Sequence, residues 1–217
     1  MKYILSILMI VGLTLSSYSK SKEVGENIDV THYEIHLNEI NVADRIIDAT
    51  TIITLKTLTS IDGIEFELKS LDVTSVTSDD AIINNFSQNG DVLSVTFGNT
   101  VTANTTISLT VNYGGTTFNE NWGGIHWSND YVYNLGVGFD SQPHNLGKTW
   151  FPCVDNFTDK ASFDLYITYP DNMLSSCGGL LSATTDNGDG TKTDHWVVSQ
   201  EIATYLMWLW WLMHSSR

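Results

Sequence analysis

Short runs that alternate between apolar and polar residues are the feature that most restricts the fold of this chain. In HYEIHL at 32–37 the odd-numbered residues are apolar and the even-numbered ones polar, and 92–97 and 107–113 repeat this period of two. Side chains two residues apart lie on the same face of a strand. No window between residues 25 and 200 carries apolar residues at the roughly 3.6-residue spacing of a helix. We therefore predict an all-β fold, an antiparallel β-sandwich or saddle.

Turn-forming residues separate these runs. NG at 89–90, GN at 98–99 and GG at 114–115 each predict a tight turn, and the polar stretch DNGDG at 186–190 predicts another. DNGDG does not have the spacing of an EF-hand calcium loop, which also needs flanking helices. No linker or internal repeat interrupts the pattern, so we predict one β domain over residues 24–206.

The N-terminus has the features of a secretory signal peptide. Lys2 is followed by the apolar run YILSILMIVGLTL and then by small polar residues, which is the order found in such peptides. The run is shorter than the roughly 20 apolar residues that span a bilayer. We predict a signal peptide at 1–20, a mature protein starting between Lys20 and Glu26, and export to the periplasm or the medium. A membrane-retained N-terminus is the alternative.

The formal charge of the chain restricts the kind of partner that it can bind. The formal net charge of −15 argues against a nucleic-acid partner, because phosphate binding needs clustered Lys and Arg.

Cys153 and Cys177 are the two cysteines. In an oxidising compartment they could form a disulfide, or both could be buried thiols. Without a CxxC pattern they do not form a zinc knuckle.

Aromatic residues and glycines crowd together between residues 119 and 147. Aromatic side chains offer large contact areas, and glycines let backbones approach closely. The segment is either a hairpin packed over the sheet or a wall of a binding groove. Its aromatic residues are Trp122, Trp127, Tyr131, Tyr133 and Phe139.

The last residues break the pattern. MWLWWLMHSSR at 207–217 has no alternating polar face, and exposed it would form the kind of apolar patch that soluble monomers avoid. We interpret 207–217 as an aberrant hydrophobic tail outside the β domain, out of frame or at a truncation.

One stretch has a more specific pattern. WFPCVDNFTDKASFDLYITYP at 150–170 resembles the signature F-P-C-x-D-E-P-x-x-K-A-x-F of the N-terminal domain of aminopeptidase N-type zinc peptidases, the M1 family. Asn156 and Phe157 stand where many members have Glu-Pro, as in a divergent branch. The resemblance covers roughly residues 27–206. The matching residues are Phe151, Pro152, Cys153, Asp155, Lys160, Ala161, Phe163 and Pro170.

The residues of this signature have structural roles of their own. Pro152 ends a strand, and the carboxylate of Asp155 can accept backbone N–H bonds in the turn that follows. Lys160 could pair with Asp155 or Asp159. The alternation at 163, 165 and 167 places three apolar side chains in the core.

The resemblance implies an exported metallopeptidase that removes N-terminal residues from peptides. In that family zinc is held by H-E-x-x-H and a downstream Glu, and a G-x-M-E-N motif binds the substrate amine. This sequence contains neither motif. We therefore assign it no catalytic residue, no metal ligand and no cofactor of its own; zinc and the peptide substrate would belong to the complete enzyme. His32, Glu34 and His36 could in principle hold a metal, but a solvated strand face explains them.

The family also implies one substrate-binding residue. A Gln or Glu shortly before F-P-C helps to form the pocket for the substrate's first side chain, and Gln142 is the nearest candidate here, one residue further from Phe151 than usual. His144 could serve instead, or Gln142 could simply face water. We predict a non-catalytic domain that supports the substrate pocket of an exported zinc aminopeptidase and is inactive alone. The alternative is a stand-alone exported β-sandwich that binds carbohydrate or protein.

Overall fold

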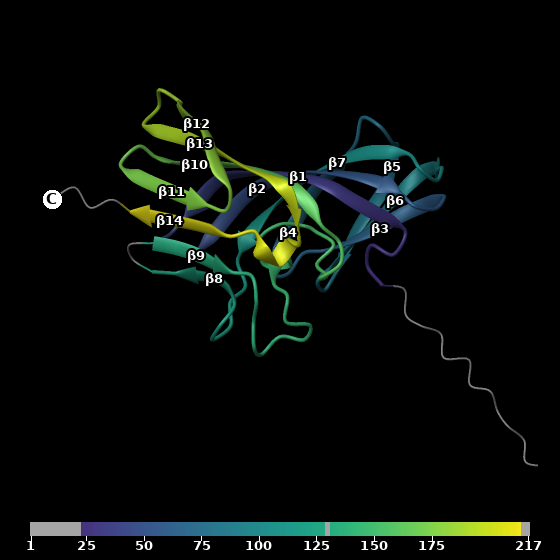
Figure 1. The fold of residues 1–217 in the computed structure, drawn as a ribbon, viewed down its shortest axis with the longest axis horizontal. Helices are drawn as coiled ribbons and strands as arrows, with labels where there is room; N and C mark the ends of the chain where they lie inside the picture. Colours follow the sequence, from purple (N-terminus) through teal and green to yellow (C-terminus); the bar gives the residue numbers. More distant parts are fainter. Residues whose placement is uncertain (1–22, 129–130, 214–217) are drawn as a thin grey trace, which may run out of the picture.

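The computed structural model describes residues 23–128 and 131–213, and its fold is all-β as predicted (Figure 1). The expected signal peptide at 1–20 lies outside the described residues. The largest sheet has seven strands in the order β12-β13-β10-β1-β2-β7-β4. These strands are β1 (Ile28–Asn41), β2 (Ile46–Thr57), β4 (Asp72–Thr77), β7 (Thr106–Thr116), β10 (Ala161–Pro170), β12 (Leu180–Asp186) and β13 (Thr191–Ile202).

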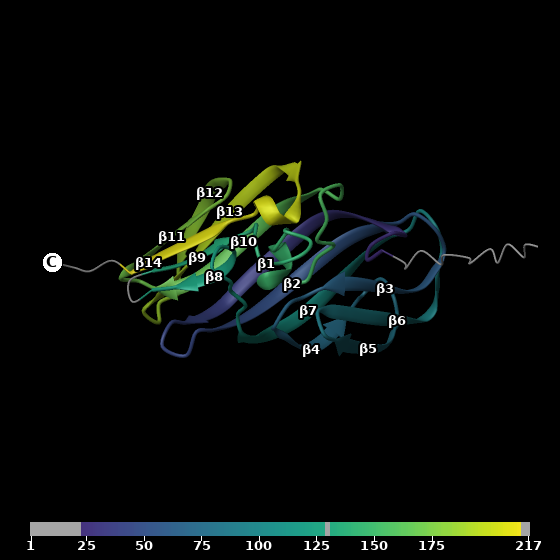
Figure 2. The ribbon, with the colours of Figure 1, turned by 90° about the horizontal axis from the view of Figure 1, so that it is seen from below.

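Two smaller sheets complete the domain. One has the order β11-β14-β9-β8 and the other the order β3-β6-β5. Figures 1 and 2 show the first beside β10 and β13 and the second at the opposite end of the molecule. Their strands are β3 (Ile61–Glu67), β5 (Ile83–Asn89), β6 (Val92–Val101), β8 (Gly124–Trp127), β9 (Tyr131–Leu135), β11 (Met173–Cys177) and β14 (Leu209–Met213); two 3₁₀ turns are η1 (Gly147–Thr149) and η2 (Thr204–Leu206).

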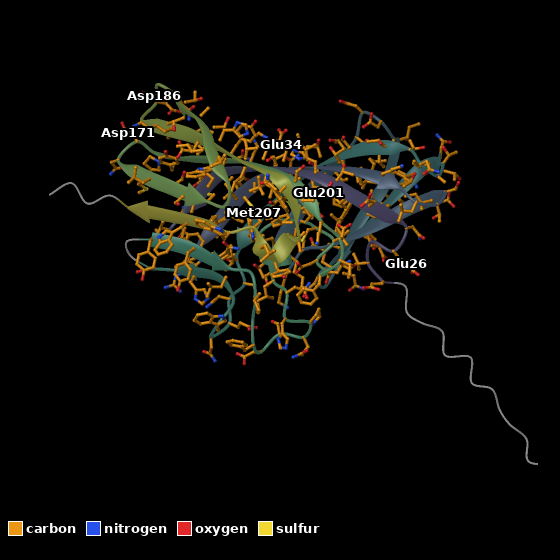
Figure 3. All side chains as sticks on the ribbon, in the orientation of Figure 1. Glu26, Glu34, Asp171, Asp186, Glu201 and Met207 are labelled. Atoms are coloured by element: carbon orange, nitrogen blue, oxygen red, sulfur yellow. The ribbon has the colours of Figure 1, made fainter. Side chains whose placement is uncertain are left out.

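The alternation seen in the sequence sets which face of the large sheet is buried. In β1 the side chains of Tyr33, Ile35 and Leu37 are buried, and those at 32, 34 and 36 are only partly covered. β10 buries its residues at 163, 165 and 167 in the same way. Figure 3 labels Glu34 on one side of the sheet and Met207 on the other, where the core lies. Removal of these apolar side chains from water is the main force that holds the sheets together.

A parallel pair of strands joins the two halves of the large sheet. β1 runs parallel to β10, with Tyr33 opposite Phe163, and the other strand pairs among the described residues are antiparallel. The two rings stack with centroids 5.3 Å apart. The two halves of the sheet are thus joined by strands from the start and the end of the domain, so its folding depends on pairing between distant parts of the chain.

The turn predictions are correct at two places and wrong at two. NG at 89–90 connects β5 to β6, with Gly90 at φ 59°, and the stretch at 186–190 connects β12 to β13. GN at 98–99 lies within β6 and GG at 114–115 within β7. Gly114 is there for close approach rather than turning, because a Cβ on it would lie 2.7 Å from the carbonyl oxygen of Ile47.

Residues 207–213, expected to lie outside the β domain, are part of it. β14 is an inner strand between β11 and β9, and Met207 and Leu209 are buried while Trp208 and Trp210 are about half exposed. The buried side-chain amide of Asn134 donates to Met207 O (3.1 Å) and accepts from Leu209 N (2.6 Å). The segment does alternate, but its outward face is aromatic instead of polar. Residues 214–217 lie outside the described residues.

The structure shows the state of the two cysteines and whether a helix of the described residues could span a membrane. Cys153 and Cys177 are both free and buried, which corresponds to the buried-thiol alternative. Within residues 23–128 and 131–213, no helix is long and apolar enough to cross a bilayer.

Candidate functional site

The predicted substrate-binding residue lies at the tip of a narrow loop, residues 136–146, between β9 and η1. Two backbone bonds close the loop, Gly138 N to His144 O at 2.8 Å and Leu146 N to Gly136 O at 2.7 Å. Gln142 is exposed, and its Nε2 lies 3.1 Å from Nε2 of His144, also exposed. The loop therefore presents both candidate residues together to solvent, with the amide of Gln142 able to bond an external group.

The base of this loop is fastened to Asp155 of the signature stretch. The buried carboxylate accepts from Lys148 N (3.3 Å) and from Thr204 Oγ1 in η2 (2.7 Å). The side-chain amide of Asn145 donates to the Asp155 carbonyl. Asp155 does accept a backbone N–H bond, but from Lys148, which precedes it; in the turn that follows, Thr158 N and Asp159 N donate to Asn156 Oδ1 instead (2.9 and 2.6 Å). Asp155 thus connects the loop base to the turn that leads to β14.

The ion pair of Asp155 involves a different lysine from the one expected. Nζ of Lys148, a buried residue, lies 2.6 Å from Glu67 Oε1 and 3.9 Å from Asp155 Oδ2. Burial raises the pKa of Glu67. Burial also opposes the charge of Lys148, but the hydrogen bond to Glu67 and the negative charges of Glu67 and Asp155 together outweigh it and raise the pKa of Lys148. Lys160 forms no ion pair among the described residues. The missed signal was Lys148 itself, a single cation in the otherwise uncharged LGKTWFPC.

The aromatic residues of the signature stretch form part of the core. Trp150 and Phe151 are fully buried, and the ring of Phe151 meets that of Tyr33 edge to face at 5.3 Å. The Tyr33 hydroxyl accepts from Val154 N (3.1 Å), and the Tyr113 hydroxyl donates to Trp150 O (3.0 Å). Residues 150–155, the start of the stretch, are all buried and form a scaffold under the loop.

Four of the five aromatic residues of the glycine-rich hairpin lie in two places, one exposed and one partly buried. Trp122 and Phe139 stack beside the loop with centroids 6.1 Å apart, and they are 52% and 70% exposed. The outward face of the four-stranded sheet carries a second group, which we call the aromatic face: His126, Tyr131, Tyr133 and Trp210. Its neighbouring rings lie 5.1–6.0 Å apart. The fifth aromatic residue, Trp127, packs against the core, and its Nε1 donates to Thr117 Oγ1 at 2.8 Å. Ile125 and Val132 of the same hairpin are buried in the core. The hairpin therefore packs over the sheet, as one alternative expected, and turns its other aromatic residues outward.

The histidines of β1 do not form a metal site. His36 Nε2 lies 2.7 Å from Glu34 Oε1, while His32 and His195 approach the two carboxylate oxygens of Asp164 at 3.2 and 2.6 Å. No group of three or more His, Cys, Asp or Glu side chains in the described part of the chain could hold a metal ion. The residues present thus do not fit the zinc site that the M1 resemblance implies for a complete enzyme.

Comparison with known proteins tests the resemblance directly. The sequence profile of the peptidase M1 N-terminal domain matches residues 29–206. The chain belongs to the peptidase M1 N-terminal domain family. This M1 N-terminal domain resembles in fold an M1 zinc metallopeptidase from Deinococcus radiodurans solved with Tyr-Ser-Ala, with a TM-score of 0.75 and 21% identity over 86% of the chain. A two-domain M1 zinc metallopeptidase with bound L-arginine gives a TM-score of 0.76 and 21% identity over 87%.

The M1 N-terminal domain spans less than half of these solved chains, 42% and 43% of their lengths. A curated relative of another kind is transcription initiation factor TFIID subunit 2 of Drosophila melanogaster. It is 39% identical over 59 residues, which are 27% of this chain and 5% of that protein.

Proposed function

We propose that this chain is the N-terminal, non-catalytic domain of an exported zinc aminopeptidase, in which it supports the substrate pocket. The observation that carries the proposal is the family match over 29–206 in a chain whose described residues hold no metal-ligand cluster. Hydrolysis would then depend on a zinc-binding domain, and this chain would supply binding surface.

The aromatic face supports docking to such a domain. Trp210 is 48% exposed and contacts Tyr131 and Tyr133, and Leu174 on β11 of the same sheet is 54% exposed. A contiguous aromatic surface of this kind marks an interaction site more often than free surface.

The loop tip supports contact with substrate. Gln142 offers an amide that can donate to a peptide carbonyl or accept from an amine, while Trp122 and Phe139 offer apolar surface beside it. Export rests on the N-terminal sequence. Edman sequencing of the secreted or periplasmic protein should start between Lys20 and Glu26; an N-terminus still at Met1 would contradict export.

The decisive experiment begins with the DNA that follows codon 200, read in all frames. We expect it to encode H-E-x-x-H, and the domain carrying that motif should hydrolyse aminoacyl p-nitroanilides faster when this chain is added. Gln142→Ala should raise KM more than kcat, whereas Gln200→Ala, an exposed glutamine on β13, should change neither. Absence of the motif, or no stimulation by the chain, would contradict the proposal.

A binding module is the second candidate. The exposed Trp122–Phe139 pair favours it, because aromatic pairs suit protein or sugar partners. If no H-E-x-x-H is encoded, binding of immobilised glycans should be measured on wild type and Trp122→Ala.

A further inference from the structure

The loop that carries Gln142 rests against a second loop, residues 117–123, between β7 and β8. This second loop is closed by Glu120 N to Gly123 O at 3.1 Å and Ile125 N to Phe118 O at 2.8 Å. Figure 1 shows both loops projecting from the body of the domain below β8 and β4. A Cβ on Gly138 would overlap the Glu120 carboxylate, so this glycine lets the two loops touch.

The Glu120 carboxylate is bonded by the segment just before Gln142. Oε1 accepts from Asp140 N at 3.0 Å, and Oε2 accepts from the Ser141 hydroxyl at 2.6 Å. The Ser141 hydroxyl, together with the backbone N–H groups of residues 139–141, lowers the pKa of Glu120. Charge-assisted bonds of this kind are stronger and more directional than neutral ones.

Apart from the backbone bond between Gly138 N and His144 O, few contacts hold the loop tip in place. Residues 142–144 are exposed, and Phe139 is 70% exposed and contacts Trp122 of the second loop. The buried anchor at Asp155 acts at the base of the loop, on residues 145 and 148. The position of the tip thus depends on polar bonds that the core does not supply.

We propose that Glu120 is a positioning residue: its carboxylate clasps residues 139–141 and so fixes Gln142 and the Trp122–Phe139 pair for substrate. This inference rests on the proposed function, because Gln142 has a substrate only in a peptidase. Glu120 acts through the loop and does not itself contact the reacting groups.

The first test measures hydrogen exchange of the full chain, wild type against Glu120→Gln, by NMR. Loss of the charged acceptor should speed exchange of the Asp140 amide at least about tenfold, the equivalent of one charge-assisted bond. Ser141→Ala should act in the same direction but less. Near-UV circular dichroism from the stacked pair, taken as the difference from Trp122→Phe, should weaken in Glu120→Gln.

A matched control is available in the β12–β13 turn. Asp189 Oδ1 accepts from Thr191 N at 3.0 Å and from Thr191 Oγ1 at 2.6 Å, the same donor types and distances as at Glu120. Asp189→Asn should speed amide hydrogen exchange in the β12–β13 turn and leave amide hydrogen exchange at residues 138–144 unchanged. If the Asp140 amide exchanged at the wild-type rate in the Glu120→Gln variant, the proposal would be overturned.

The second test uses p-nitroanilide hydrolysis by the reconstituted enzyme. Glu120→Gln should raise KM about tenfold with kcat little changed, and Glu120→Asp should restore part of the loss. Normal KM in a Glu120→Gln enzyme whose loop exchanges faster would overturn the positioning role. Failure of the proposed function can be told apart from failure of the positioning role. In that case the wild-type chain would give no peptidase activity, while the effect of Glu120→Gln on amide hydrogen exchange would be unchanged.

Discussion

Nζ of Lys148 lies 2.6 Å from Oε1 of Glu67, although the two residues are 81 positions apart in the chain. This contact ties the segment before Phe151 to the end of β3, where Glu67 and Cys153 also exchange backbone bonds of 2.8 and 3.0 Å. The pair lies beneath the loop of Gln142 and neutralises charge next to Asp155. A buried ion pair of this kind is costly to break from one side, because the remaining charge has no partner.

Lys148→Met should therefore destabilise the domain by about 3–5 kcal/mol, measured by urea unfolding at pH 7. Lys69→Met is the control, since Lys69 forms a pair of similar length, 3.0 Å, with the more exposed Asp91. It should cost about 0–1 kcal/mol. Equal losses in the two variants would show that the Lys148 cluster is not effectively buried.

Asp159 should make stability depend on pH. Burial is the main cause that raises its pKa to about 6, and its Oδ2 atom has no partner among the described residues. The folded state disfavours the charged form, so stability falls as pH rises from about 4 to about 6 and then levels off. Asp159→Asn should be more stable than wild type at pH 7 by about 1–2 kcal/mol, after allowance for partial exposure, with little difference near pH 3.5. Urea unfolding at the two pH values checks this; a difference that does not change with pH would contradict it.

Neither cysteine should react in the folded protein. Burial raises the pKa of both thiols, so little thiolate is present or accessible at pH 8. Ellman's reagent should detect no thiol in native protein and two in urea without reductant. No thiol in urea would show a disulfide, and a rapidly reacting thiol in native protein would contradict the burial.

Met207 should contribute to stability even though it follows the matched family region. Its side chain is fully buried, so Met207→Ala should cost about 2–5 kcal/mol in thermal or urea unfolding. Leu206→Ala, at a neighbouring side chain that is 49% exposed, should change stability by about 0.5 kcal/mol or less. Similar small effects at both positions would mean that β14 adds little to the fold.

Much of the architecture could be predicted because strand alternation is local. The buried set in β1 and β10 followed directly from a period of two, and so did the turns at 89–90 and 186–190. The turn predictions at 98–99 and 114–115 were wrong because glycine also allows two strands to approach closely. That use of glycine becomes visible only when the strands are paired. The prediction that residues 207–217 lie outside the β domain was wrong for a related reason. Whether an apolar face is buried or exposed depends on which elements of the fold lie opposite it.

By itself, the sequence determined the all-β class and, through the pattern that begins with Phe151, Pro152 and Cys153, the family. Only the tertiary structure placed Lys148 against Glu67, Glu120 against the loop of Gln142, and β14 between β11 and β9. The physical reason is that alternation and signature motifs are encoded within a few neighbouring residues. Charge pairing and strand order instead join residues from distant parts of the chain, and their partners are defined only once the backbone is folded.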